Sequence, residues 1–316
     1  MSTAVVSYVV NAGPRQVAPA TAARVRAAIE ELGYRPNLSA RALRRGTTDL
    51  IGLVVPDSTN PFFAELARGI ERAAAQRGLS MLLVNSNSSG HLERQHVESL
   101  AHRQVSGLLV ASAVARHELD LGDRRGIPTV LINTDGPVPG FHTIGPDSHR
   151  GTQTAVEHLL DTHQARTVAL ATGPLGYVEA NSREQGWLDA LTQNARPAGR
   201  MLEGGFSREG GYQIGRELMA GDLPDAVFAI SDLQAIGILR ALHEAGVRVP
   251  EDVALVAFDG TEESEYSWPP LTVVRQPITA MAKAAVDVVL NPSQANPGHD
   301  TFPTDLVIRR SCGCTP

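Results

Sequence analysis

Residues 50–63 read LIGLVVPDSTNPFF, a continuous apolar run that stops at a polar loop. An apolar run without alternation is typical of a strand that is buried on both faces of a parallel sheet. A helical pattern follows as far as Gly78, and a second apolar run begins at Ser80. This order predicts a strand–helix–strand unit in a sheet that is wrapped by helices.

The same cycle returns along the chain. Further apolar runs lie at 107–111, 128–132, 167–171, 225–230 and 252–258, with helical stretches between most of them. The pattern also restarts, because residues 50 to about 145 and 165 to about 260 repeat one order of strands, loops and helices. We therefore expect an α/β fold with two doubly wound parallel-sheet lobes, one after the other.

The loops after the predicted strands are the candidate site, since ligands of such sheets bind beyond the carboxyl ends of the strands. Carboxylates, amides and an arginine hold hydroxyl groups, and aromatic rings offer faces to a sugar or a planar ring. Asp and Asn are also common in turns for local reasons, so only their shared placement argues for a site. The loop residues are Asp57, Asn60, Phe62, Phe63, Asn85, Asn87, Asn133, Asp135, Asp147, Tyr177, Arg183, Phe206, Ser231, Asp232 and Asp259.

Motifs with a catalytic mechanism are absent from the sequence. It has no GxxxxGK[ST] phosphate loop, no GxGxxG after a strand, no HExxH and no GxSxG. Loop carboxylates could form an acid–base pair, as in a glycosidase, but the sequence gives no separation between them. We expect a protein that is not an enzyme and that has no cofactor and no metal.

Cys312 and Cys314 are the two cysteines of the chain, and they lie one residue apart. They are too few and too close in sequence to stabilise a fold through disulfide bonds. A metal shared by them would need two more ligands, and no His pair has the sequence spacing to supply them. We expect both thiols to be structurally idle.

The net charge divides unevenly along the chain. Residues 1–48 carry seven arginines and two glutamates, a net charge of +5, so the remainder carries −11 of the total of −6. A basic head on an acidic body is typical of a nucleic-acid binder. A solvated basic surface explains the charge alone equally well. No membrane span or secretion signal is evident, which places the protein in the cytoplasm.

The basic head contains three predicted helices. Residues 2–11, STAVVSYVVN, carry an apolar valine face that needs a packing partner. Residues 19–33 begin with a proline and end with a glycine, and Val25, Ala28, Ile29 and Leu32 form one apolar stripe. Residues 37–46 predict a short third helix, in which Leu43 is either an apolar wedge between arginines or a core-facing linker residue.

Taken together, these segments resemble the LacI/GalR family of transcriptional regulators. Residues 17–78, which include GYRPNLSARALRRG and LIGLVVPDSTNPFF, look like the family's junction of DNA-reading head, hinge helix and first lobe strand. The resemblance continues at 105–110, 126–133, 144–160, 224–260, 270–277 and 306–314, which read VSGLLV, GIPTVLIN, IGPDSHRGTQTAVEHLL, PDAVFAISDLQAIGILRALHEAGVRVPEDVALVAFDG, PLTVVRQP and LVIRRSCGC. It covers nearly the whole chain.

The resemblance implies the division of the chain. A small all-α head and hinge helix occupy 1–48. The periplasmic-binding-protein-like body follows, with an N-terminal lobe formed by 49–149 and 276–304. Its C-terminal lobe is formed by 150–275 and 305–316.

The resemblance also implies how DNA is read. Residues 2–11 are similar to the second, recognition helix of a helix-turn-helix, which enters the major groove. By that match Thr3, Ala4 and Tyr8 face bases, Ser7 faces a phosphate, Leu43 is the hinge wedge, and Arg44 lies in the minor groove. About fifteen residues of the family pattern, the first helix and the turn, do not precede this stretch, so the motif is partial. A gel shift with an upstream-extended chain is expected to show operator binding that this chain lacks.

For the body, the resemblance implies a small-molecule effector between the lobes. Arg183 and Asp259 match the family's ligand-gripping pair, and Phe63, Asp147, Tyr177 and Phe206 match other pocket positions. Asp57, Asn60, Phe62 and Asp232 complete the predicted effector site. Ser231 replaces an Asn that the family often has, and the aromatic and carboxylate mixture favours a sugar or sugar phosphate over a nucleobase.

The implied protein is a homodimeric repressor that binds a pseudo-palindromic operator under effector control. The alternative is a sugar-binding protein without DNA-binding activity. A periplasmic-type sugar-binding protein shares the two-lobed body, but it would need a signal peptide and would have no use for an arginine-rich hinge.

Overall fold

The computed structural model describes residues 3–10, 16–33, 48–112, 119–174, 178–291 and 297–315. It separates the chain into two compact units, residues 1–48 and residues 49–316. The third helix predicted for the head, with Leu43 and Arg44, lies outside the described residues.

The smaller unit contains two described helices. Helix α1 spans Thr3–Val10 and packs against α2, which spans Pro19–Glu31. Pro19 begins α2, Ala18 gives no side-chain cap, and Val25 is buried, all as the sequence predicts. Leu32 departs from the predicted stripe, because it lies just beyond the helix and is 78% exposed.

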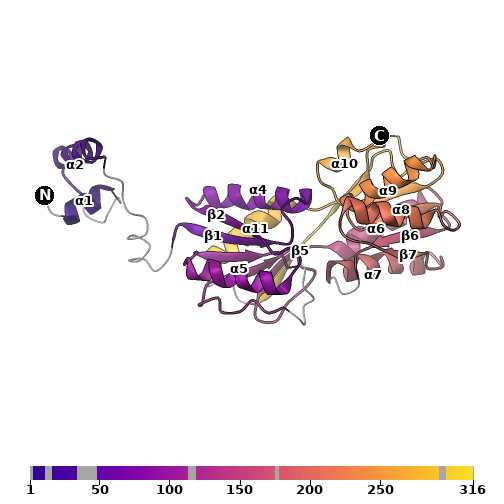
Figure 1. The fold of residues 1–316 in the computed structure, drawn as a ribbon, viewed down its shortest axis with the longest axis horizontal. Coiled ribbons are helices and arrows are strands. Elements are labelled where there is room, and N and C mark those ends of the chain that lie inside the picture. The colour runs from indigo at the N-terminus through magenta and orange to yellow at the C-terminus, as the bar shows by residue number, and fades with distance from the viewer. Residues whose placement is uncertain are drawn as a thin grey trace. The chain divides into compact units, whose positions relative to one another are not determined.

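The larger unit contains two six-stranded sheets, as the repeated cycle predicts (Figure 1). The first sheet has the order β11-β5-β4-β3-β1-β2, and its strands are all parallel. Val54 of β1 pairs with Val84 of β2 and Val110 of β3, which explains the uninterrupted apolar runs. The strands are β1 (Leu50–Val55), β2 (Ser80–Asn85), β3 (Gly107–Val110), β4 (Thr129–Ile132), β5 (His142–Pro146) and β11 (Gly298–Phe302).

The second sheet repeats this arrangement with the order β12-β10-β9-β8-β6-β7. Its strands are parallel except for the edge strand β12, which runs antiparallel to β10. They are β6 (Val168–Thr172), β7 (Met201–Glu203), β8 (Ala226–Ala229), β9 (Ala254–Asp259), β10 (Thr272–Arg275) and β12 (Asp305–Val307).

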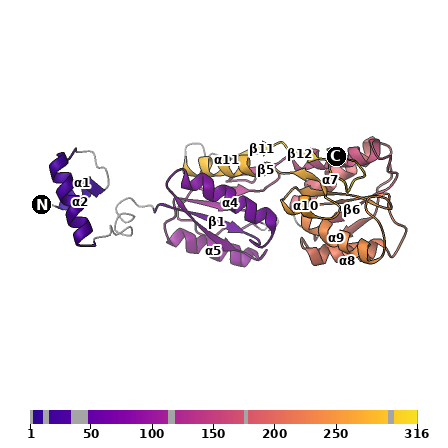
Figure 2. The ribbon, with the colours of Figure 1, turned by 90° about the horizontal axis from the view of Figure 1, so that it is seen from above.

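Helices cover both faces of each sheet, so the strands are buried on both sides (Figure 2). In the first lobe, α4 (Pro61–Ala75) and α11 (Ile278–Leu290) pack on one face and α5 (Gly90–His102) packs on the other. The second lobe has α6 (Ser148–Asp161) and α7 (Val178–Gln193) on one face, and α8 (Arg208–Leu218) and α9 (Asp232–Glu244) on the other. A short helix, α10, spans Glu263–Tyr266.

The chain passes between the two sheets three times. It leaves the first sheet after β5, returns after β10 through α11 and β11, and enters the second sheet again at β12. Each lobe is therefore completed by a segment from late in the chain. These crossings connect the lobes close to the carboxyl ends of β5, β10 and β11.

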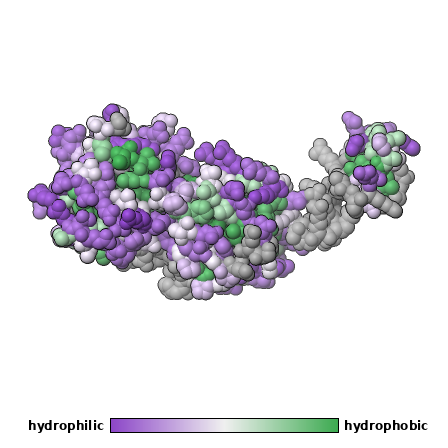
Figure 3. Space-filling model, turned by 180° about the vertical axis from the view of Figure 1, so that it is seen from behind, coloured by the Kyte–Doolittle hydropathy of each residue, from purple (hydrophilic) through white to green (hydrophobic). Residues whose placement is uncertain are grey.

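The surface of the molecule is mostly polar on the face that Figure 3 presents, where apolar residues gather in smaller patches. Among the described helices, none has both the length and the apolar composition that a membrane span requires.

Candidate ligand-binding site

A cavity of about 200 Å³ lies where the carboxyl ends of the strands in the two sheets face each other. Residues of both lobes form its wall, so a ligand in it would touch both. They are Pro56, Asp57, Asn60, Phe62, Phe63, Ser88, Asn133, Pro174, Arg183, Gly205, Phe206, Ser231 and Asp259. Seven of the ten effector residues predicted from the sequence are therefore brought together.

The wall from the N-terminal lobe is formed by the loop after β1 and the start of α4. Asn60 begins that helix, because its side-chain oxygen accepts a hydrogen bond from the backbone N–H of Phe62 at 3.0 Å. Phe62 and Phe63 are in edge-to-face contact, with ring centroids 5.1 Å apart. One carboxylate oxygen of Asp57 accepts two hydrogen bonds from Thr59, which shapes the loop. This wall offers amide and carboxylate oxygens beside aromatic faces.

Arg183 and Asp259 form the charged part of the opposite wall. The Nη1 atom of Arg183 lies 3.7 Å from Oδ1 of Asp259, and both side chains are nearly buried. The guanidinium also donates to the carbonyl of Ile230 and stacks over the Phe258 ring at 3.9 Å. Its Nε has no hydrogen-bond partner among the described residues. The pair is thus held in place by the surrounding protein, while a buried donor of Arg183 is left without a partner in the described part of the chain.

Asp259 also has an unusual backbone and an unusual acidity. Its φ of 109° turns the chain sharply at the end of β9, and Gln276 donates a 2.9 Å hydrogen bond to its Oδ1. Burial raises the pKa of Asp259 from 3.8 to about 6, against the opposing effect of the Arg183 charge. This carboxyl group therefore titrates just below neutral pH.

Two predicted carboxylates occupy helix starts and do not line the cavity. Asp147 begins α6 by accepting a hydrogen bond from the N–H of Arg150 at 3.0 Å. Asp232 is buried at the first turn of α9, and its Oδ2 accepts two hydrogen bonds from Thr261. Burial, followed by the nearby charge of Asp259, raises the pKa of Asp232. Asp232 therefore lies close to Asp259 and supports the loop after β9.

One predicted effector residue has no described position, and three polar residues outside the predicted effector set line the cavity. Tyr177 lies outside the described residues, so the structure gives no position for it. Ser88, Asn133 and Ser231 also line the cavity, although they are not among the ten predicted effector residues. Asn133 and Ser231 follow strands and are among the loop residues that the strand-end pattern selected from the sequence. Ser88 comes three residues after β2 and has a φ of 56°, for which the pattern offers no signal.

The predicted DNA-reading residues lie on α1 or beyond the described part of the chain. Thr3, Ala4, Ser7 and Tyr8 are carried by α1, and Tyr8 is half-buried. Val5, Val6 and Val9 are half-buried as well, which is consistent with the packing of α1 against α2. No contact of α1 with DNA is present to assign the four roles.

Two doubly wound lobes with a cavity between their strand ends define a class of small-ligand-binding proteins, and here a helical unit precedes them. Residues 48–308 match the model for periplasmic binding proteins and the sugar-binding domain of the LacI family. Residues 1–37 match the model for the lacI family of bacterial regulatory proteins. The chain belongs to the LacI family, and it is a DNA-binding transcriptional regulator with an effector-binding body.

Individual relatives agree with this assignment. The ribose operon repressor of Escherichia coli K12 is 34% identical over 92% of this chain and 89% of its own length. The transcriptional repressor PurR of Haemophilus influenzae is 34% identical over 92% of this chain and 87% of its own. A crystal structure of the Lac repressor bound to ONPG superposes with a TM-score of 0.90 at 29% identity, covering 98% of this chain and 96% of that one.

One further relative was solved with a sugar in place. The LacI-family regulator from Enterococcus faecium with bound ribose has a TM-score of 0.74 and 30% identity, and the match covers 83% of this chain and 98% of that chain.

Proposed function

We propose that this regulator is a cytoplasmic repressor whose operator binding is controlled by a neutral monosaccharide held between the lobes. The observation that supports this proposal is a cavity at the strand ends that both lobes line, with Arg183 and Asp259 opposite Asp57 and Asn60. Hydroxyl groups both donate and accept hydrogen bonds, which matches a wall of carboxylates, amides and a guanidinium.

The size and charge of the cavity favour a free sugar. About 200 Å³ lies below the range of roughly 300–1,000 Å³ that is typical of drug-sized ligands, so a monosaccharide suits it better than a disaccharide or nucleotide. Arg183 is the one cation among the described residues that line the cavity, and it already faces Asp259. A phosphate ester would therefore meet a wall whose positive charge is largely neutralised.

Ribose is the first candidate because of the relatives. The E. coli relative is a ribose operon repressor, and the E. faecium structure contains ribose. In the cavity, Phe62, Phe63 and Phe206 accompany carboxylates suited to several hydroxyl groups. An aromatic face against the C–H face of a sugar ring, with carboxylates at the ring edge, is the arrangement that we propose.

Control of DNA binding follows from the position of the cavity. A ligand that touches both lobes stabilises one relative arrangement of them, by no more than its difference in affinity for the two arrangements. We propose that a homodimer, with two heads on a pseudo-palindromic operator, senses that arrangement. A Lac repressor dimer has been solved on its operator, in line with such an assembly. In this role the body binds its ligand without converting it.

A thermal-shift panel tests the ligand class. D-ribose is expected to raise the Tm of the protein in a saturable way, because binding only to the folded state stabilises it. Ribose 5-phosphate and the purine bases guanine and hypoxanthine serve as competing classes. A larger shift with the phosphate ester or a purine, and none with any free sugar, would refute the neutral-sugar proposal.

The pH dependence of sugar affinity tests the role of Asp259. The pKa of Asp259 in the folded protein is about 6, so below pH 6 its carboxyl group is mostly protonated when no sugar is bound. The group must lose this proton before it can accept hydrogen bonds from sugar hydroxyls as a carboxylate. We expect a loss of ribose affinity of about tenfold between pH 7 and 5. Calorimetry of the protein and of Asp259→Asn makes the comparison, and the variant should bind weakly with little pH dependence.

Protonation of Asp259 weakens sugar binding, but it stabilises the folded protein. Because the folded pKa exceeds the usual 3.8, the folded state binds more protons than the unfolded state between these values. This group alone therefore lowers the free energy of unfolding as pH rises from about 4 to about 6.

A further inference from the structure

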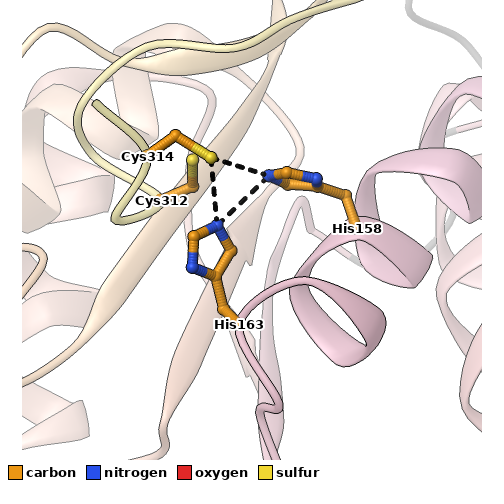
Figure 4. Close-up of side chains that lie close together, drawn as sticks. All are labelled: His158, His163, Cys312 and Cys314. Carbon is orange, nitrogen blue, oxygen red and sulfur yellow. Dashed lines mark hydrogen bonds between the residues drawn. The ribbon is translucent and has the colours of Figure 1, made fainter. Parts of the chain in front are cut away.

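Four potential metal ligands meet at the C-terminal end of α6, outside the cavity. His158 lies in the last turn of α6 and His163 follows the helix, while Cys312 and Cys314 belong to the C-terminal segment. One ligand atom from each lies within 4.8 Å of all the others. Figure 4 shows the two imidazole rings and the two thiols directed toward a common centre. Cys312 is buried and the other three side chains are half-buried.

We propose that these four side chains bind one Zn²⁺ ion in a tetrahedral Cys₂His₂ site. This set is closed, since it supplies all four ligands from the protein, which is typical of structural rather than catalytic zinc. Thiolate and imidazole together favour Zn²⁺ over Mg²⁺ or Ca²⁺, which prefer oxygen ligands.

The separations among His158, His163 and Cys314 agree with a tetrahedral ion, and Cys312 supplies the fourth ligand atom within 4.8 Å of these three. The Nε2 atoms of His158 and His163 are 3.3 Å apart. The Cys314 sulfur lies 3.4 Å from Nε2 of His163 and 3.7 Å from Nε2 of His158. Zinc bonds of about 2.0–2.1 Å to nitrogen and about 2.3 Å to sulfur place tetrahedral ligands about 3.4 Å apart for two nitrogens and about 3.6 Å apart for nitrogen and sulfur. The nitrogen–nitrogen separation of 3.3 Å is close to its tetrahedral value, and the two nitrogen–sulfur separations, 3.4 and 3.7 Å, lie on either side of theirs.

The surroundings orient the ligands for a metal. Nδ1 of His158 lies 3.3 Å from the Thr162 hydroxyl oxygen. A hydrogen bond donated there would leave the Nε2 lone pair free for the ion, as a supporting contact does in many zinc sites. Gly313, between the cysteines, has a φ of 107°, and a Cβ there would lie 3.1 Å from Nδ1 of His163. A glycine therefore lets the Cys-Gly-Cys turn close over the imidazole.

The proposed ion would fasten the end of the chain to the C-terminal lobe. Ser311 is already tied to β9, because its carbonyl accepts from the N–H of Leu255 and its hydroxyl donates to the Leu255 carbonyl. Zinc would add a second attachment, from the next turn to α6, which covers the same sheet. It would stabilise the lobe without entering the effector cavity.

The absence of other cysteines makes the test specific, since any thiol signal comes from this site. The purified, reduced protein is loaded with Zn²⁺ and passed over a chelating resin. We expect about one zinc per chain to be retained, and both thiols to be protected from Ellman's reagent until a strong chelator is added. Co²⁺ in place of zinc should give the visible and near-ultraviolet bands of tetrahedral thiolate coordination.

Variants separate the proposed site from other zinc binding. Cys314→Ser and His163→Asn should each weaken zinc binding at least tenfold, whereas the exposed His91→Asn should leave it unchanged. Zinc should also raise the Tm of the unmodified protein and not that of Cys312→Ser/Cys314→Ser. Circular dichroism of the chelated forms shows whether each variant is folded.

Three results would overturn the proposal. One is the absence of a Co²⁺–thiolate band in the unmodified protein, a reading that requires no variant to fold. Another is full zinc retention in the double serine variant, which would mean an adventitious ion only. The third is an intact mass showing that Cys312 and Cys314 join in a disulfide under reducing conditions, because a disulfide leaves no thiolate to bind zinc.

Discussion

Arg183→Met and Asp259→Asn are each expected to raise the Kd for ribose at least 100-fold, which corresponds to about 2.7 kcal/mol. Both side chains line the cavity and are nearly buried. Each variant removes hydrogen bonds to sugar hydroxyls and leaves its former partner unpaired in the wall. Losing one member of a buried charged pair typically costs about 3–5 kcal/mol. Calorimetry measures the affinity, and urea unfolding measures the stability.

A double variant separates binding from folding. Arg183→Met/Asp259→Asn leaves neither charge unpaired, so its free energy of unfolding should exceed that of the less stable single variant. Its ribose affinity should stay as low as theirs. Arg208→Met is the matched control, since it breaks an exposed ion pair with Glu263 in the same lobe and should change both quantities by less than about 1 kcal/mol. Near-normal ribose binding in the double variant would show that the pair does not grip the ligand.

Gly211→Val is expected to cause the largest loss of stability without touching the cavity. Gly211 lies where α8 crosses α9, and a Cβ there would overlap the backbone of Gln234. Backbone atoms cannot yield as a flexible side chain does, so the helices would have to separate. We expect the free energy of unfolding to fall by about 3 kcal/mol or more and the Tm to fall by about 6–12 °C.

The effect should also reach the effector site through Gln234. This side chain donates hydrogen bonds to the carbonyl of Thr172, the last residue of β6, at 2.9 Å and to the carbonyl of Gly204, directly after β7, at 3.1 Å. Gly221→Ala is the control, because its Cβ would meet only the guanidinium of Arg200, at 3.2 Å and above. Thermal melting of the two variants makes the comparison. An equal fall in Tm for Gly211→Val and Gly221→Ala would contradict the packing argument.

The apolar runs marked seven strands, the edge strand β2 among them, and missed the inner strands β5 and β10 and the edge strands β7, β11 and β12. The run at 50–55 coincides with β1, since a strand with neighbours and helices on every side must be apolar throughout. Strand β11 reads GHDTF and remains half-buried at a sheet edge, so no apolar run marks it. Strand β7 has three residues, and one of them is buried. These two edge strands lack the burial that produces the signal.

The site was predictable only in part, because the same residue types serve two purposes. Asp57 and Asp259 face the cavity, whereas Asp147 caps a helix and Asp232 supports a loop. A carboxylate after a strand has the same sequence context in all four cases. The Cys₂His₂ cluster was not predicted, although His158 and His163 have an H-x₄-H spacing that zinc sites use. About 150 residues separate these histidines from the cysteines, and only the fold joins the two pairs.

The central claim is that a sugar bound between the lobes changes the affinity of the regulator for its operator. A fluorescent duplex is enriched from a random pool by the upstream-extended chain, and its binding to that chain is titrated by anisotropy with and without ribose at saturation. We predict that the sugar changes the operator Kd by about 5- to 150-fold, the usual size of coupling between two binding sites. In Arg183→Met the sugar should no longer change the operator Kd. Operator affinity that is identical with and without any sugar that binds the cavity would contradict the account.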